Sequence, residues 1–271
     1  MTRRDPQDPV PVQRSIDGGS AGSSPEAAPE APPASSAQLS PDRFRDPRRR
    51  LARRIAQRVF LQGLAYRTVR RTVVTHPAAD ALDGACIVVA NHSSHLDAPL
   101  IIGALPGKLG RYVAAGAAAD YFFDVWWRKG LTALFFNAFP VDRSGLRGRR
   151  GLATSLLDDG VPLLLFPEGT RSRTGEMGNF KPGAAALCIS RDVPCLPIAL
   201  YGASRAMPYG KTWPGKGKPP VFVNFGEPMR PDDGESVAGF SERIAKEVRG
   251  LYDEAQDHAA RLGQVPQLPG A

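Results

Sequence analysis

The sequence predicts one α/β domain with a single, largely parallel β-sheet flanked by helices, and three observations support this fold class. Several short runs of consecutive apolar residues, such as 86–90 and 195–200, have the pattern of strands that are buried on both faces. Longer stretches with helical periodicity separate these runs, and this alternation is typical of α/β proteins. The chain has 271 residues, of which 42% are hydrophobic, so it can form one sizeable core.

Two segments precede the predicted domain. Residues 1–41 are rich in Pro, Ala, Ser and Gly and have almost no large apolar side chain, so we expect a disordered tail. Residues 42–74 contain a basic stretch, 45–72, whose apolar side chains recur at helical spacing among arginines. This pattern predicts a basic amphipathic helix. Such a helix either lies on an anionic membrane surface or packs its apolar stripe on the core, and both alternatives stay open.

The predicted domain covers residues 75–262 and leaves a short C-terminal tail, residues 263–271. Its strands are expected at 86–90, 112–115, 139–141, 162–166, 195–200 and 221–225. Its helices are expected at 98–105, 118–135, 148–158, 182–190 and 236–260. Prolines 194 and 197 suggest that their strand lies at a sheet edge or contains a bulge.

Composition limits the classes of partner and the compartment. The chain has 35 Lys and Arg against 27 Asp and Glu, a formal net charge of +8, which favours an anionic partner. Nucleic acid is not expected, because no nucleic-acid-reading motif accompanies the arginines. The three cysteines, at 86, 188 and 195, lie in apolar segments without metal-ligand spacing, so we expect reduced core residues. No apolar run is long enough to span a bilayer, and the N-terminus lacks the apolar core of a signal peptide, so we expect a cytoplasmic protein.

A cluster of mostly polar residues, NHSSHLD at 91–97, follows the predicted strand 86–90. His92 and Asp97 are five positions apart, so a turn at the start of a helix can bring the carboxylate to one imidazole nitrogen and raise the basicity of the other. A histidine held in this way can take a proton from an alcohol. The asparagine and the two serines are expected to cap the helix or hold the loop, and His95 is either a supporting residue or exposed.

Cationic side chains lie at the ends of three other predicted elements. Arg143 and Arg171 each lie just beyond a predicted strand, and Lys181 precedes a predicted helix. The planar guanidinium fork suits phosphate, and Gly169 allows backbone amides to approach a ligand closely. These residue types favour a phosphorylated substrate that is bound near His92.

Four stretches in this order resemble the motifs of the glycerolipid acyltransferase family, which includes the 1-acylglycerol-3-phosphate acyltransferases. They are NHSSHLD at 91–97, FPVDR at 139–143, FPEGTRS at 166–172 and VPCLPI at 193–198. The first and third are highly specific when they occur together. The second departs from the common pattern, because Asn137 occupies a position where glycine is frequent in the family.

The resemblance implies an O-acyltransferase in which His92, oriented by Asp97, is the general base and no metal or cofactor takes part. The acyl donor would be acyl-CoA or an acyl carrier protein, and the acceptor would be 1-acylglycerol-3-phosphate, which gives phosphatidic acid for phospholipid synthesis. A set of six residues would bind the acceptor's phosphate, and within this set Glu168 and Gly169 would shape the loop. The full set is Arg143, Glu168, Gly169, Thr170, Arg171 and Lys181.

Several alternatives stay open. Another lysolipid or a glycolipid could be the acceptor, or the chain could be an inactive lipid- or phosphate-binding module. A serine hydrolase that uses Ser93 or Ser94 is disfavoured, because neither lies in a nucleophile elbow. Since acceptor and product are lipids, we expect a peripheral position on the anionic cytoplasmic membrane face. The arginines at 45–72 and the aromatic stretch at 121–129 are the candidate membrane contacts, although the aromatic stretch fits a buried helix or an acyl-chain tunnel equally well.

Overall fold

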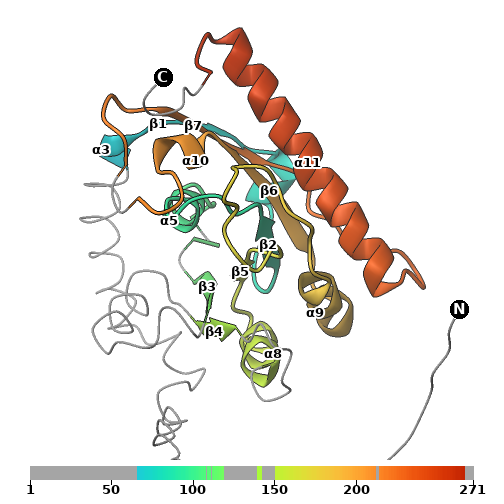
Figure 1. The fold of residues 1–271 in the computed structure, drawn as a ribbon. Coiled ribbons are helices and arrows are strands. Elements are labelled where there is room, and N and C mark those ends of the chain that lie inside the picture. Colours follow the sequence, from blue (N-terminus) through green and yellow to red (C-terminus); the bar gives the residue numbers. More distant parts are fainter. Residues whose placement is uncertain are drawn as a thin grey trace, which may run out of the picture. The chain divides into compact units, whose positions relative to one another are not determined.

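Seven strands of the described chain form one sheet with the spatial order β1-β7-β6-β2-β5-β3-β4 (Figure 1). The structure is a computed structural model, and it describes residues 66–107, 109–110, 112–118, 139–141, 150–211 and 214–265. The strands are β1 (Arg70–Val74), β2 (Ile87–Ala90), β3 (Ala114–Ala118), β4 (Phe139–Val141), β5 (Leu163–Leu165), β6 (Cys195–Tyr201) and β7 (Pro220–Phe225).

The sheet is largely parallel, as the sequence predicted. Five of the six strand pairs are parallel, and only β6 and β7 run antiparallel. Strand β2 lies between its two parallel neighbours, with Ile87 opposite both Leu163 and Cys195. Because β2, β5 and β6 point the same way, the loops that follow them meet at one edge of the sheet, where α/β folds bind ligands.

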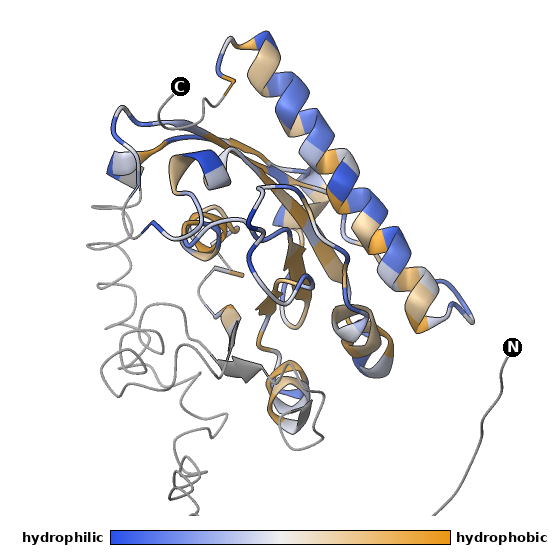
Figure 2. Ribbon diagram, viewed as in Figure 1, coloured by the Kyte–Doolittle hydropathy of each residue, from blue (hydrophilic) through white to orange (hydrophobic). Residues whose placement is uncertain are grey.

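Helices cover both faces of the sheet, which confirms the predicted α/β class (Figures 1 and 2). One face packs against α4 (Pro77–Asp80), α5 (Asp97–Ile102) and α10 (Ala203–Ala206) through a cluster that includes Val88, Leu100 and Leu196. The opposite face packs against α8 (Arg150–Asp158), α9 (Gly183–Arg191) and α11 (Val237–Arg261) through a cluster that includes Val89 and Phe240. Successive β2 residues therefore enter different clusters, as the alternation of side chains along a strand requires.

Helix α11 shows how the sequence pattern becomes structure. Ser236 accepts a hydrogen bond from the Gly239 N–H at 3.0 Å and caps the helix. Apolar side chains then recur every three or four residues and are buried against the sheet, while the opposite side of the helix is polar. The buried residues are Phe240, Ser241, Ile244, Ala245, Val248, Leu251, Ala255 and Ala259.

The structure corrects the predicted N-terminal segment at its end. Residues 70–72 were expected in the basic helix, but Arg70–Val74 form β1, which pairs in parallel with β7 from Arg70 opposite Pro220. Only a short helical turn, α3 (Tyr66–Thr68), precedes it. This pairing with a strand 150 positions away overrides the local helical periodicity, because β1 provides backbone hydrogen-bond partners for the edge of β7.

Several other expectations fall wholly or mostly on residues outside the described ranges. These are the tail at 1–41, the basic stretch at 45–65, most of the helix at 118–135 and the aromatic stretch at 121–129. Among the helices that the structure describes, none is long and apolar enough to cross a membrane.

The prolines left two alternatives for β6, a sheet edge or a bulge. The edge position is wrong, because β6 lies inside the sheet between β2 and β7, whereas the bulge is present in its pairing with the segment after β7. The Pro197 carbonyl accepts a hydrogen bond from the Gly226 N–H at 2.9 Å. A backbone N–H at position 197 would point to this same side of β6, but proline has none. There the ladder changes register: Ile198 pairs with Phe225 but Cys195 pairs with Met229, so the partner segment holds one extra residue. The interior position tolerates proline because the ladder is interrupted at this point.

The three cysteines are buried and free, as predicted. Burial raises the pKa of the Cys86 thiol to about 12, so the thiol stays protonated in the core.

Candidate active site

The loop between β2 and α5 carries the predicted base and its partner. Strand β2 ends at Ala90 and α5 begins at Asp97, so residues 91–96 form the turn at the carboxyl edge of the sheet. His92 Nδ1 lies 2.9 Å from Asp97 Oδ2, and the predicted hydrogen bond is therefore present. The Asp97 side chain is fully buried, whereas the His92 side chain is 21% exposed. A reactant can thus reach the imidazole but not the carboxylate.

Asp97 is fixed by more than the histidine. Its Oδ2 also accepts the backbone N–H groups of Ser93 and Ser94, each at 2.7 Å. These three donors to Oδ2 offset part of the cost of burying a charge, while Oδ1 is buried with no hydrogen-bond partner among the described residues. Because a carboxylate only accepts hydrogen bonds, it selects the His92 tautomer with the proton on Nδ1 and leaves Nε2 as the basic nitrogen.

The loop after β5 holds the imidazole from its face and from its backbone. The ring of Phe166 stacks on that of His92 with centroids 4.1 Å apart and an interplanar angle of 18°. The Ser172 N–H donates to the His92 carbonyl at 2.8 Å. Parallel pairing of β2 and β5 brings these two loops together, although more than 70 residues separate them in the chain.

Glu168 ties the β5 loop to the base. Its Oε1 accepts from the His92 N–H at 2.6 Å, and its Oε2 accepts from the Gly178 N–H at 2.9 Å. Burial raises the pKa of Glu168, and these two backbone donors partly offset the rise. With one oxygen bonded to the His92 N–H and the other to the Gly178 N–H, Glu168 holds the shape of the loop, which is the part expected of it.

Gly169 and Lys181 lie against each other. Gly169 has a φ of +74°, a conformation that favours glycine, and a Cβ there would lie 2.8 Å from Lys181 Nζ. The Lys181 N–H donates to the Pro167 carbonyl at 3.0 Å, which fixes the start of the segment that leads into α9. The lysine side chain is exposed and crosses the loop at the glycine, while Thr170 beside it is exposed. The structure therefore brings Lys181 to the predicted phosphate loop.

Arg171, in the same loop, contacts Tyr209 and is close enough to His95 to lower its pKa. Its guanidinium carbon is 5.0 Å from the centroid of the Tyr209 ring. The pKa of His95 is lowered from 6.5 to about 4, first by burial and then by the positive charges of Arg171 and His92. His95 is thus a neutral neighbour of the base at ordinary pH. Arg143, the other arginine that the sequence singled out, lies outside the described residues, as does Asn137.

Asn91 and Ser94 hold the loop, as the sequence indicated. The Asn91 side chain accepts the Leu200 N–H at 2.8 Å and donates to the Leu200 carbonyl at 3.0 Å, so it extends the ladder between β2 and β6. The buried Ser94 hydroxyl donates to the Met207 carbonyl at 3.0 Å. Since this hydroxyl is buried and donates to a backbone carbonyl instead of the imidazole, Ser94 is not placed as a nucleophile activated by His92.

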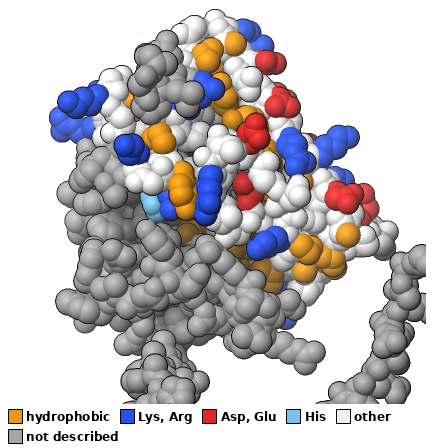
Figure 3. All heavy atoms as spheres, viewed as in Figure 1, with side chains coloured by type: hydrophobic (Ala, Val, Ile, Leu, Met, Phe, Trp, Pro, Cys, Tyr) orange, Lys and Arg blue, Asp and Glu red, His pale blue; other side chains and the backbone are white. Residues whose placement is uncertain are grey.

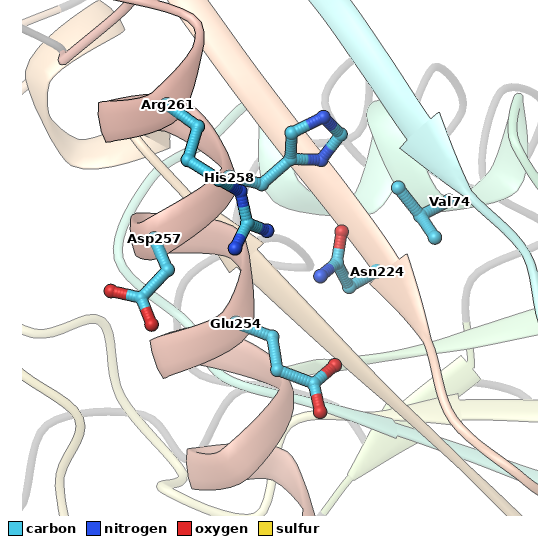
Figure 4. Close-up of a pocket in the computed structure, with 6 residues that line it drawn as sticks. All are labelled: Val74, Asn224, Glu254, Asp257, His258 and Arg261. Carbon is cyan, nitrogen blue, oxygen red and sulfur yellow. The ribbon is translucent and has the colours of Figure 1, made fainter.

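Two further features lie on the surface of the described chain. On the face shown in Figure 3, Lys and Arg side chains lie beside a histidine and hydrophobic side chains. A separate pocket of about 220 Å³ lies between α11 and the strands β1 and β7, and it contains none of the predicted site residues (Figure 4). Its lining consists of Val74, Asn224, Glu254, Asp257, His258 and Arg261. Within the described ranges, no group of three or more His, Cys, Asp or Glu side chains is placed to hold a metal ion.

Comparison with known proteins agrees with this arrangement. A family model described as acyltransferase matches residues 59–201, which is more than half of the chain. The 1-acyl-sn-glycerol-3-phosphate acyltransferase BAT2 of Brassica napus is 29% identical over 54% of this chain and 40% of its own length. The alpha form of Bos taurus is 31% identical over 68% of this chain and 63% of its own length. The chain therefore spans less than two thirds of either relative.

A solved structure shares the fold. The 1-acyl-sn-glycerophosphate acyltransferase PlsC from Thermotoga maritima aligns with a TM-score of 0.57 and 23% identity, over 78% of this chain and 97% of that chain. The neighbour shows the fold, and the family match over more than half of the chain leads to one conclusion: the chain belongs to the acyltransferase family.

Proposed function

We propose that this protein transfers a fatty acyl group from an acyl thioester to the free hydroxyl of 1-acylglycerol-3-phosphate and so makes phosphatidic acid. The observation that carries the proposal is the buried Asp97 carboxylate, 2.9 Å from Nδ1 of a histidine whose side chain is partly exposed. Both relatives described above are named for this acceptor.

The chemistry uses His92 first as a base and then as an acid. The acceptor hydroxyl attacks the thioester carbonyl carbon while its proton passes to Nε2, and the Asp97 carboxylate stabilises the resulting imidazolium. When the tetrahedral intermediate collapses, the C–S bond breaks, and the leaving thiolate takes the proton from Nε2. The products are an ester and a free thiol, and the histidine returns to its starting state. No covalent acyl-enzyme is needed.

The acceptor's phosphate is held, on this proposal, by Arg171 and Lys181 with Arg143. Arg171 is adjacent to Ser172, whose N–H donates a hydrogen bond to the His92 carbonyl. This bond holds the backbone beside the cation close to the backbone of the base. Lys181 crosses the same loop at Gly169. Gripping the phosphate near the base orients the hydroxyl for attack, which is a large source of rate enhancement.

The donor and the location are further parts of the proposal. Acyl-CoA and an acyl carrier protein both present a thioester, and either fits the mechanism. A peripheral seat on the anionic cytoplasmic face of a membrane suits a lipid acceptor and a chain with a net charge of +8. Flotation with anionic liposomes at low and high salt tests this seat, and failure to float under both conditions would contradict it.

The experiment that tests the activity is thiol release from an acyl-CoA, with and without lysophosphatidate. We expect release that depends on the acceptor and falls on the order of a hundredfold or more in His92→Ala and in Arg171→Ala. His258→Ala and Arg249→Gln, both on α11, are controls of matched residue type and should keep wild-type activity. Release that survives His92→Ala would refute the mechanism.

The acceptor is tested in the same assay. Release with a lysophospholipid or glycolipid in place of lysophosphatidate would assign another substrate within the same reaction class. Lysophosphatidate binding without thiol release from any acyl thioester would favour an inactive binding module.

A further inference from the structure

One exposed tyrosine carries two guanidinium groups. Tyr209 is 44% exposed and lies in the loop after α10. The guanidinium carbon of Arg171 is 5.0 Å from its ring centroid and that of Arg173 is 5.5 Å away. Both distances are within the range of a cation–π contact, so the negative face of the ring partly offsets the repulsion between the two cations.

Hydrogen bonds attach this cluster to the base from two sides. Ser172, between the two arginines in sequence, donates its N–H to the His92 carbonyl at 2.8 Å. Two residues before Tyr209, the Met207 carbonyl accepts from the buried Ser94 hydroxyl at 3.0 Å. The tyrosine and the arginines therefore have fixed backbone positions relative to the histidine loop.

The two guanidinium groups have the chemistry of a phosphate site. Neither Arg171 nor Arg173 makes an ion pair with a carboxylate among the described residues. A phosphate monoester carries a charge of about −1.5 to −2 near neutral pH, and two adjacent guanidinium forks can match both its charge and its oxygens. A lysophosphatidate headgroup is such a monoester, whereas a phosphodiester or a neutral headgroup has less charge to pair.

We propose that Tyr209 is a positioning residue that holds both Arg171 and Arg173 against its ring, and that Arg173 is a second guanidinium ligand of the acceptor's phosphate. The inference rests on the proposed function and adds to it two residues that the motif analysis did not single out. Tyr209 acts through the arginines, so its loss should weaken acceptor binding and leave the chemical step nearly unchanged.

The test compares Tyr209→Leu, Tyr209→Phe and Arg173→Gln in steady-state kinetics with lysophosphatidate and with monoacylglycerol, which lacks the phosphate. Tyr209→Leu keeps apolar volume but loses the ring face, so the KM for lysophosphatidate should rise roughly 5- to 30-fold with little change in kcat. Tyr209→Phe keeps the ring face and should restore the wild-type KM. Arg173→Gln should raise the same KM, and no variant should change the KM for monoacylglycerol.

Arg249→Gln is the matched control for Arg173→Gln, because it also removes one positive charge, from an exposed arginine on α11 that is not part of the loop. A wild-type KM in Tyr209→Leu, an equal rise for monoacylglycerol, or a loss in Tyr209→Phe as large as in Tyr209→Leu would each overturn the inference. An equal rise in Arg249→Gln would also overturn it, because general attraction to anionic substrate would then explain the effect.

Binding of a short-chain lysophosphatidate, followed by calorimetry, separates this inference from the proposed function. If the wild type binds the lipid without turnover, and Tyr209→Leu weakens binding while Tyr209→Phe does not, the cluster is supported and the proposed activity is wrong. If the wild type turns the lipid over and Tyr209→Leu binds it equally well, the activity stands and the inference is wrong.

Discussion

Replacing Asp97 with asparagine should lower kcat/KM for acyl transfer by roughly 10³-fold while the fold persists. The Oδ2 position accepts two backbone N–H groups and the His92 Nδ1–H. An asparagine must place its carbonyl oxygen there, because its NH₂ group would face three donors. The histidine tautomer is therefore kept, and what is lost is the negative charge beside the imidazolium that forms during the reaction.

The magnitude follows from the separation of the two charges. With Nδ1 and Oδ2 2.9 Å apart, the centres of the imidazolium and the carboxylate are about 4 Å apart. At an effective dielectric constant of about 20 their attraction is about 4 kcal/mol. Since about 1.4 kcal/mol corresponds to a tenfold change in rate, removal of the charge costs roughly three orders of magnitude.

The assay is thiol release at saturating donor and varied lysophosphatidate, with thermal unfolding measured on the same samples. Asp80→Asn is the matched control, because Asp80 is an exposed acid on α4 and its loss changes the net charge equally. A kcat/KM for Asp97→Asn within tenfold of the wild type, in protein that is folded, would refute the view that this carboxylate stabilises the imidazolium.

Three more variants test the surroundings of the base. Glu168→Gln should lower kcat more than it raises KM. The NH₂ group of the glutamine must face one of the two backbone N–H donors, and this unpaired contact costs about 1–3 kcal/mol. An unchanged kcat would contradict this reasoning. Burial raises the pKa of Glu168, so the stability that its protonated form provides is complete below pH 4.5 and is lost as the pH rises through the folded pKa. In urea unfolding, the difference in free energy of unfolding between the wild type and Glu168→Gln should therefore shrink as the pH rises. A difference that stays constant with pH would contradict this. Gly169→Ala should raise the KM for lysophosphatidate by displacing Lys181 Nζ, whereas Gly263→Ala, also at positive φ but with open space around it, should only lower stability, by about 1–2 kcal/mol. Equal KM values in the two glycine variants would count against the role of the lysine. The pKa of His95 is lowered from 6.5 to about 4, so the neutral, half-buried imidazole contributes stability that is complete above pH 6.5 and is lost as the pH falls through about 4. His95→Gln should therefore reduce the pH dependence of the free energy of unfolding in this range. An unchanged slope would show that another group causes it.

The sequence by itself determined the elements whose signal is local. Consecutive apolar residues predicted β2, β5 and β6, and the spacing of Phe240, Ile244, Val248 and Leu251 predicted α11. These patterns reflect burial of each element on its own face, so a short window of residues contains the information. The motif residues likewise identified His92 and Asp97 as a pair, because only a turn at the start of a helix separates them.

Only the tertiary structure decided what depends on contacts between distant segments. Local periodicity assigned Arg70 to a helix, but pairing with β7 places it in a strand. The prolines of β6 were compatible with a sheet edge or a bulge, and only the strand pairing shows that β6 is interior with the extra residue in its partner segment.

The same limit applies to the site. Nothing near Glu168 in sequence reveals that its carboxylate holds the His92 backbone, and nothing near Tyr209 reveals two arginines over its ring. The physical reason is that strand order brings the loops after β2, β5 and β6 to one edge of the sheet. That order is fixed by packing and pairing of the whole chain, whereas a sequence window reports only the preference of its own residues.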